Sequence, residues 1–294
     1  MFATKVKSYA KVNLSLNING TAGGYHLIDS VVVPIDVCDT VRAKPRRDSL
    51  INVYMHGMGS ESIPPEKNNA VKAGEAFAAA FGTRGADIEI YKDIPIGAGL
   101  GGSSADAAGV LNALAKMYKV TDRAALKAIA DSLGSDTGYM LGGGFARISG
   151  RGERVEPLAG MPLHMLLILP PTSVSAGECY REYDAAPDAP RTDSARLAEA
   201  LAAGDFAGVA QNVYNALAAP ACRLNADVAE ALAQAAAFSP SAYGVSGSGS
   251  AVFALFESEE LCRWAKSRYR GKFRTRVVAA KPAAKMSLRN PFAL

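Results

Sequence analysis

A glycine- and serine-rich segment, IPIGAGLGGSSADAAGV at residues 94–110, stands between an apolar run and an alanine-rich sequence typical of a helix. Ordering glycine costs conformational entropy, so this composition indicates a backbone that bends sharply or approaches a ligand closely. The amides of such a turn, together with the N-terminus of the following helix, are suited to hold phosphate oxygens. We therefore predict a phosphate-binding turn, with Ser103 and Ser104 capping the helix.

Three other interpretations of this segment fit less well. A Walker A motif requires Lys and then Ser or Thr after its last glycine, but Gly102 is followed by Ser-Ser-Ala. The dinucleotide fingerprint G-x-G-x-x-G is matched by Gly97, Gly99 and Gly102, yet Asp122, about where the acidic ribose ligand is expected, has the context of a helix N-cap. A flexible linker does not usually run directly into a capped amphipathic helix.

The composition is that of a globular protein with one large domain or two of moderate size: 294 residues, 49% hydrophobic and 20% charged. The net charge is +4, and the basic clusters KPRRD and KSRYRGKFRTR are short, which favours solvated faces over a nucleic-acid site. Cys38, Cys179, Cys222 and Cys262 have no metal-site spacing. The apolar runs are too short for a membrane span, and the N-terminus lacks the apolar core of a signal peptide, so we expect a cytoplasmic protein without nucleic-acid or membrane partners.

The first half of the chain alternates predicted strands and helices. Residues 10–18 read as one strand, with Val12, Leu14, Leu16 and Ile18 on one face and Lys11, Asn13, Ser15 and Asn17 on the other. Further strands are expected at 29–43, interrupted by Pro34, at 50–57 and at 86–95. Helices are expected at 68–82, ending at Gly82, and in two segments between the glycine turn and Leu133.

The second half predicts a different lobe. A buried strand at 164–170 precedes alanine-rich helices at 193–237, and the glycine-rich sequence YGVSGSGSAVFALFE at 243–257 opens another strand. We predict an α+β fold in two lobes, with the boundary near residue 170. The N-terminal lobe, residues 1–170, is mixed α/β and carries the phosphate loop, and the C-terminal lobe, residues 171–294, places helices on a small antiparallel sheet.

The three segments IPIGAGLGGSSADAA, YGVSGSGSAVFALF and AKVNLSL resemble, in order and spacing, the three signature motifs of the GHMP kinases, the family of galactokinase, homoserine kinase and mevalonate kinase. Within this family, AKVNLSLNINGTAGGYHLIDS and SVSAGECYREYD resemble members that act on a cytidine-diphosphate methylerythritol. The chain departs from the pattern at Thr21-Ala22-Gly23, where Arg and Asp are usual, and at Gly138, where proline is usual. The resemblance covers nearly the whole chain and implies an ATP-dependent alcohol kinase.

The resemblance implies ATP and Mg²⁺ as cofactors, with Ser104 as the hydroxyl beside the metal. It assigns ATP binding to Pro95, Gly97, Ala98, Gly99, Leu100, Gly101, Gly102, Ser103 and Ser104. It makes Asp136 the base that accepts the proton of the substrate hydroxyl, with Lys11 near the same hydroxyl to favour the developing alkoxide. From the residues alone, Asp136 is equally well a turn aspartate and Lys11 a solvated edge lysine. The adenine is expected near PPEKNNAVKAGEAF, residues 64–77.

The resemblance places the remaining site residues around the substrate. Asn13 is expected to hydrogen-bond the diphosphate or the polyol, and His26 to contact the polar edge of the pyrimidine while Tyr25 stacks on its face. Tyr180 is expected to supply a second ring, in a cytosine sandwich with Tyr25. Without the resemblance, each of these is an ordinary strand, capping or packing residue.

Gly247 and Gly249 are expected to turn amides toward the diphosphate or to support the first glycine turn. Tight packing alone would also require glycine there.

We expect phosphorylation of the methylerythritol C2 hydroxyl. The alternatives are another small-alcohol kinase of the same family, of homoserine or mevalonate type, and an inactive nucleotide-binding protein on the same fold. The pairing of Lys11 with Asp136 argues against the inactive form. The sequence leaves the oligomeric state open as monomer or homodimer.

Overall fold

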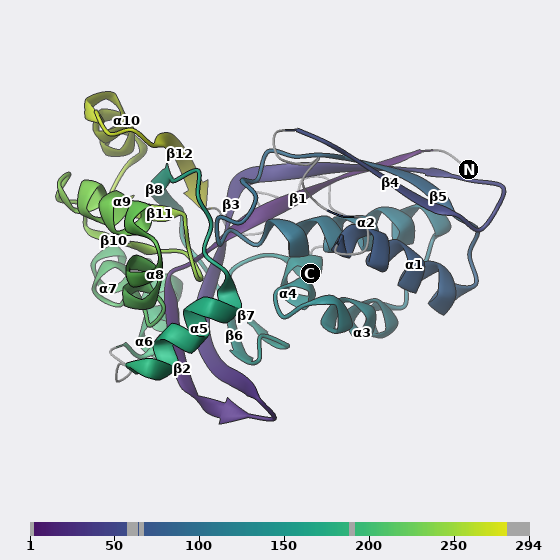
Figure 1. Ribbon diagram of the computed structural model, residues 1–294, viewed down its shortest axis with the longest axis horizontal. Helices are drawn as coiled ribbons and strands as arrows, with labels where there is room; N and C mark the ends of the chain where they lie inside the picture. Colours follow the sequence, from purple (N-terminus) through teal and green to yellow (C-terminus); the bar gives the residue numbers. More distant parts are fainter. Residues whose placement is uncertain (1–2, 58–63, 65–67, 188–191, 281–294) are drawn as a thin grey trace.

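The computed structural model describes residues 3–57, 64, 68–187 and 192–280, which form two lobes with an α+β architecture, as predicted (Figure 1). In the N-terminal lobe, four helices lie against one face of a sheet (Figure 1). Its strands are β1 (Thr4–Asn13), β2 (Ser15–Ala22), β3 (Tyr25–Pro45), β4 (Ile51–His56), β5 (Ala86–Tyr91), β6 (Ala146–Gly150) and β7 (Arg154–Pro157). Its helices are α1 (Asn69–Phe81), α2 (Gly102–Tyr118), α3 (Arg123–Leu133) and α4 (Thr137–Gly142).

The C-terminal lobe is built on an antiparallel sheet in the order β10-β11-β8-β12. Its strands are β8 (Leu163–Leu169), β9 (Tyr214–Asn215), β10 (Ala242–Val245), β11 (Val252–Phe256) and β12 (Arg274–Ala280). Its helices are α5 (Ala176–Ala185), α6 (Ser194–Ala203), α7 (Phe206–Gln211), α8 (Ala218–Leu224), α9 (Ala226–Ala236) and α10 (Glu259–Arg268). Strand β8 precedes residue 170 but pairs with β11 and β12 of the C-terminal lobe, so strand pairing crosses the expected lobe boundary. The position of that boundary stays a prediction.

The long strand β3 joins the two lobes and pairs with strands of both (Figure 1). The expected interruption at Pro34 is wrong, because β3 continues through this residue. Pro34 lies opposite Lys11, where the register of β1 shifts between Tyr9 and Lys11. A bulge in the partner strand tolerates a residue that has no N–H to donate.

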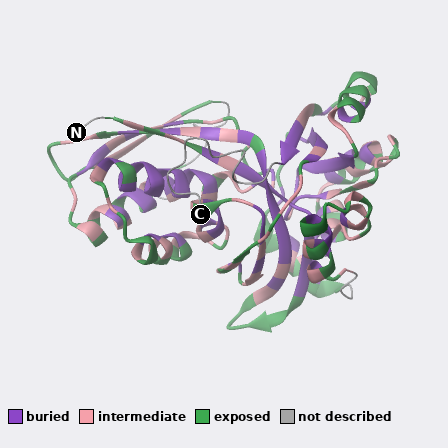
Figure 2. Ribbon diagram, turned by 180° about the vertical axis from the view of Figure 1, so that it is seen from behind, coloured by how far each residue is buried: buried purple, intermediate pink, exposed green. Residues whose placement is uncertain are grey.

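The alternating segment at residues 10–18 is not one strand, because the chain bends at Leu14 between β1 and β2. Asn13 pairs with Val32 of β3, whereas Ser15 already pairs with Tyr214 of β9. Both faces of this segment are buried, including its polar side chains (Figure 2). The polar members are Lys11, Asn13, Ser15 and Asn17. A buried polar stripe must find partners inside the protein, and this requirement fixes the positions of its side chains.

Two helix ends follow the local sequence signals, and one expected cap is wrong. The Asp122 side chain accepts from Ala125 N and begins α3, and Gly82 ends α1 in the left-handed region, as predicted. Helix α2, however, begins after Gly101 in a left-handed conformation with no side-chain cap, so Ser103 and Ser104 lie within its first turn. The first amides of α2 are therefore left for a ligand, since N-terminal helical amides have no intrahelical partner.

Candidate active site

The loop between β5 and α2 is held in a conformation that only glycine adopts easily. Gly97, Gly99 and Gly101 have φ values of 69°, 75° and 75°. A Cβ on Gly99 would meet Ser246 O at 2.1 Å, and one on Gly101 would meet Met140 Cε at 2.2 Å. The loop thus needs glycine for its dihedral angles and for close packing. Its backbone leads directly into the exposed amides of α2, as a phosphate cradle requires.

Lys11 and Asp136 meet beside this loop. Lys11 Nζ lies 3.4 Å from Asp136 Oδ2, with side-chain exposures of 5% and 29%. The Lys11 N–H donates to Leu100 O (3.1 Å), which joins β1 to the glycine loop. Asp136 precedes α4 without capping it, so its carboxylate is available to the cavity. The geometry supplies a partly exposed carboxylate next to a buried cation.

Asn13 holds the Lys11 side chain in place. Its Oδ1 accepts from Lys11 Nζ, and its Nδ2 donates to Ser30 Oγ (2.8 Å). Its backbone N–H donates to Ser246 Oγ (3.3 Å), which in turn donates to Gly99 O (3.1 Å). Asn13 therefore orients the cation within a network that also reaches the glycine loop. The sequence did not single out Ser30 or Ser246, because an isolated serine carries no such signal.

The last of the chain's three glycine-rich segments, at residues 243–257 and called here the third glycine-rich segment, closes over the first, at residues 94–110. Ala251 N donates to Ala98 O (3.0 Å), and a Cβ on Gly247 would lie 3.3 Å from Gly99 O and 3.5 Å from Lys11 Nζ. Gly247 thus borders the site. A Cβ on Gly249 would instead meet Val245 and Val228 side chains, so this glycine faces the core of the C-terminal lobe.

A cavity of about 390 Å³ collects most of the predicted residues. The predicted residues that line it are Lys11, Asn13, Gly97, Ala98, Gly99, Gly101, Gly102, Ser103, Ser104, Asp136, Tyr180 and Gly247. Pro95, Leu100, Tyr25, His26 and Gly249 are not among its lining residues. Leu100 is 1% exposed and packs in the core, whereas the unpredicted Arg151 and Ser248 line the cavity. Of the expected adenine segment, residues 65–67 lie outside the described part, and Asn69 Nδ2 donates to Ser103 Oγ (3.1 Å).

The aromatic residues are arranged differently from the expected sandwich. His26 stacks on Tyr180, with ring centroids 4.5 Å apart and an interplanar angle of 20°. His26 Nε2 lies 2.7 Å from Asp184 Oδ1. Tyr25 is 57% exposed. Its ring faces Arg151 instead of Tyr180, and the guanidinium carbon of Arg151 lies 4.9 Å from the ring centroid. Burial raises the pKa of Tyr180, and the charge of Asp136 raises it further, so this phenol stays neutral beside the cavity.

A buried ionic cluster that the sequence did not reveal lies at the base of the glycine loop. Lys92 Nζ is 2.5 Å from both Asp39 Oδ2 and Asp106 Oδ2, and all three side chains are at most 4% exposed. Asp39 Oδ1 accepts from Asp93 N (2.7 Å) and Ile94 N (2.9 Å). Burial lowers the pKa of Lys92, but its contacts with Asp106 and Asp39 reverse this and raise it overall. The cluster joins β3, the loop and α2 through charge-assisted bonds.

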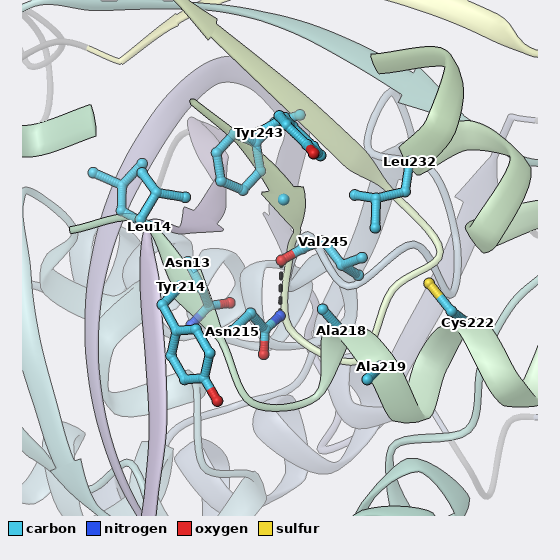
Figure 3. Close-up of a pocket in the computed structure, with 13 residues that line it drawn as sticks. Asn13, Leu14, Tyr214, Asn215, Ala218, Ala219, Cys222, Leu232, Tyr243 and Val245 are labelled. Atoms are coloured by element: carbon cyan, nitrogen blue, oxygen red, sulfur yellow. Dashed lines mark hydrogen bonds between the residues drawn. The ribbon is translucent and has the colours of Figure 1, made fainter. Parts of the chain in front are cut away.

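A second cavity, of about 440 Å³, lies between β9, α8 and β10 (Figure 3). Its lining residues carry no charged side chain, which makes it unsuitable for phosphate. Asn215 Nδ2 donates to Val245 O (2.8 Å; Figure 3) and Gly247 O (2.7 Å), so this region supports the third glycine-rich segment from behind.

The described residues contain no cluster of three or more His, Cys, Asp or Glu able to hold a metal, and their four cysteines are free. Within the same ranges, no helix has the length and hydrophobicity needed to cross a membrane.

The family descriptions "GHMP kinases N terminal domain" and "GHMP kinases C terminal" match residues 68–146 and 197–266. A 4-diphosphocytidyl-2-C-methyl-D-erythritol kinase from Pelotomaculum thermopropionicum is 36% identical over 266 residues, covering 89% of this chain and 92% of the relative. One from Clostridium beijerinckii is 33% identical, covering 93% and 100%. A crystal structure of 4-(cytidine 5'-diphospho)-2C-methyl-D-erythritol kinase has a TM-score of 0.78 at 31% identity, covering 95% and 100%.

The chain belongs to the GHMP kinase family, as its three motifs predicted, and is an ATP-dependent kinase. Homoserine kinase from Cytophaga hutchinsonii, with a TM-score of 0.72 at 17% identity over 95% of each chain, shares the fold.

Proposed function

We propose that this chain transfers the γ-phosphoryl group of ATP to the C2 hydroxyl of 4-diphosphocytidyl-2-C-methyl-D-erythritol, a step of non-mevalonate isoprenoid precursor synthesis. The observation that carries the proposal is the Lys11–Asp136 pair at 3.4 Å, which lies beside the glycine loop in the cavity that Tyr180 also lines. Relatives of that name cover nearly the whole chain.

In the proposed reaction, Asp136 accepts the proton of the hydroxyl as its oxygen attacks the γ-phosphorus in line, and the bond from that phosphorus to the bridging oxygen breaks to release ADP. Lys11 stabilises the alkoxide that develops on the attacking oxygen. The amides of the glycine loop and of the first turn of α2 neutralise charge on the phosphate oxygens. Asn13 acts through Lys11, by holding its ammonium group.

The proposal includes Mg²⁺, with Ser104 as a protein oxygen beside it. Ser104 Oγ and Thr137 Oγ1 lie 3.8 and 3.3 Å from the point that a Cβ on Gly134 would occupy. Thr137 Oγ1 is buried and has no hydrogen-bond partner among the described residues, so oxygen donors are available at this point. Few protein ligands suffice, because Mg²⁺ bound to nucleotide phosphates keeps several waters and supplies charge neutralisation.

The proposal also assigns cytosine recognition to His26 and Tyr180. Because Asp184 lies on the Nε2 side of His26, a proton on Nε2 leaves Nδ1 as an acceptor. An acceptor suits the exocyclic amino group of cytosine and disfavours the carbonyl oxygen of uracil. We further propose that the enzyme works in the cytoplasm, as a monomer or homodimer.

The test is ATP consumption in the presence of 4-diphosphocytidyl-2-C-methyl-D-erythritol, mevalonate, homoserine or galactose. The proposal expects turnover with the first compound and a product that carries the new phosphate at C2 by NMR. Preferential turnover of one of the three small alcohols would assign the chain to another branch of the family.

A further inference from the structure

The turn between β6 and β7 carries Arg151 and packs directly against the segment that precedes Asp136. A Cβ on Gly152, whose φ is 112°, would lie 2.9 Å from Ser135 O. The Arg151 N–H donates to Glu153 Oε2 (2.6 Å), which closes the turn. The backbone of Arg151 is therefore fixed relative to the proposed catalytic base.

Arg151 lines the same cavity as Lys11 and Asp136. Its guanidinium carbon lies 4.9 Å from the ring centroid of Tyr25, which begins β3. A guanidinium over an aromatic face is attracted to the ring and keeps its N–H groups free to donate at its edge. Tyr25 thus holds Arg151 over the cavity without lining the cavity itself.

The two cations that line the cavity differ in what they contact. Lys11 is engaged with Asp136 and Asn13. For Arg151, by contrast, no carboxylate in the described part of the chain forms an ion pair with the guanidinium. A planar guanidinium with free donors matches the geometry of phosphate oxygens and binds them in a bidentate manner.

We propose that Arg151 binds the diphosphate of the nucleotide substrate and thereby distinguishes a cytidine diphosphate ester from a simple alcohol. This inference rests on the proposed function, since it assumes a substrate whose diphosphate lies between the base and the reacting hydroxyl. The amides of the glycine loop serve the phosphates of ATP, so Arg151 supplies charge to the other anionic reactant.

The test compares Arg151→Gln and Arg151→Lys with Arg154→Gln. Arg154 lies on the same hairpin, its side chain is 79% exposed, and its Nε approaches Glu153 Oε1 only at 3.9 Å. Arg154→Gln therefore removes the same positive charge as Arg151→Gln and serves as the control. Calorimetry measures binding of CDP and of cytidine, and steady-state kinetics measures KM for the diphosphocytidyl substrate and for ATP. Thermal unfolding of each variant checks that the fold is retained.

Arg151→Gln is expected to weaken CDP binding and raise the substrate KM by about 10- to 100-fold, because a charge-assisted bond is lost. Cytidine binding, the KM for ATP and kcat should stay near wild-type values, Arg151→Lys should recover part of the loss, and Arg154→Gln should change none of these quantities. The inference would be overturned if Arg151→Gln bound CDP as tightly as the wild type, or if it lost as much affinity for cytidine as for CDP. A rise in the KM for ATP in place of the KM for the diphosphocytidyl substrate would also overturn it. A wild-type protein that binds CDP through Arg151 but does not phosphorylate the substrate would overturn the proposed function alone.

Discussion

The ammonium group of Lys11 and the carboxylate of Asp136 lie 3.4 Å apart, although one residue belongs to β1 and the other precedes α4. Their separation in sequence means that the fold creates this pair. The backbone bond from Lys11 N to Leu100 O places the pair at the glycine loop, where an alcohol and a triphosphate can meet.

Lys11→Met should lower kcat by about 10²- to 10³-fold, because a group that stabilises developing negative charge is removed. ATP affinity should change little, since the glycine loop is untouched. The matched control is Lys7→Met on the exposed part of the same strand, which should retain full turnover. Steady-state kinetics of both variants checks this, and equal effects at the two positions would show that Lys11 has no special role.

The glycine loop and the α+β class could be predicted from local composition and periodicity, whereas most of the residues found in the cavity were expected only through the resemblance to the family's motifs. The polar side chains at 11, 13, 15 and 17 were expected on one face of a strand, but their burial arises from contacts with distant elements. Lys92, Asp39 and Asp106 meet only in the folded chain. Arg151 was not predicted, because its position at the cavity depends on the packing of Gly152 against Ser135, which are distant in sequence from Lys11 and form this contact only in the folded chain.

Gly99→Ala should abolish ATP binding and lower the free energy of unfolding by about 1–3 kcal/mol, as overpacking does. The added methyl would meet the backbone oxygens of Ser246 and Gly249 at 2.1 and 2.9 Å, and these cannot move without shifting the third glycine-rich segment. Gly142→Ala is the control, because nothing lies within 4 Å of its Cβ position. Denaturant unfolding and ATP calorimetry measure the two effects. If Gly99→Ala bound ATP with wild-type affinity, the assignment of the glycine loop to ATP binding would be contradicted.

Substitutions of Tyr180 and His26 should have different kinetic effects, the first on substrate affinity and the second on the choice of base. Tyr180→Ala should raise KM for cytidine and uridine analogues alike, because stacking accepts either base and contributes about 1–3 kcal/mol. His26→Ala should reduce the preference for the cytidine analogue over the uridine analogue, because the acceptor for the cytosine amino group is lost. The measurement is kcat/KM for both analogues in each variant. Full discrimination by His26→Ala, or a wild type indifferent to the base, would refute this assignment.

Stability should fall with rising pH through the Asp106 cluster. Burial raises the pKa of Asp106 from 3.8 to about 8, with Asp39 adding to the rise and Lys92 opposing it. Between these two values the folded state holds a proton that the unfolded state has released, so the stabilisation falls from about pH 4 to pH 8 and then levels off. The difference in unfolding free energy between wild type and Asp106→Asn should follow this course in denaturant titrations from pH 5 to 9. A difference that stays constant would show that Asp106 is ionised throughout.

The most direct test is the rate of phosphoryl transfer from ATP to 4-diphosphocytidyl-2-C-methyl-D-erythritol in a single turnover, for wild type and Asp136→Asn. Asparagine keeps the shape of the side chain but cannot accept the proton, so transfer should slow by about 10²- to 10⁴-fold while ATP affinity barely changes. Wild type should yield the C2 phosphate. An Asp136→Asn protein that transfers phosphate at nearly the wild-type rate would contradict the account and place the base elsewhere.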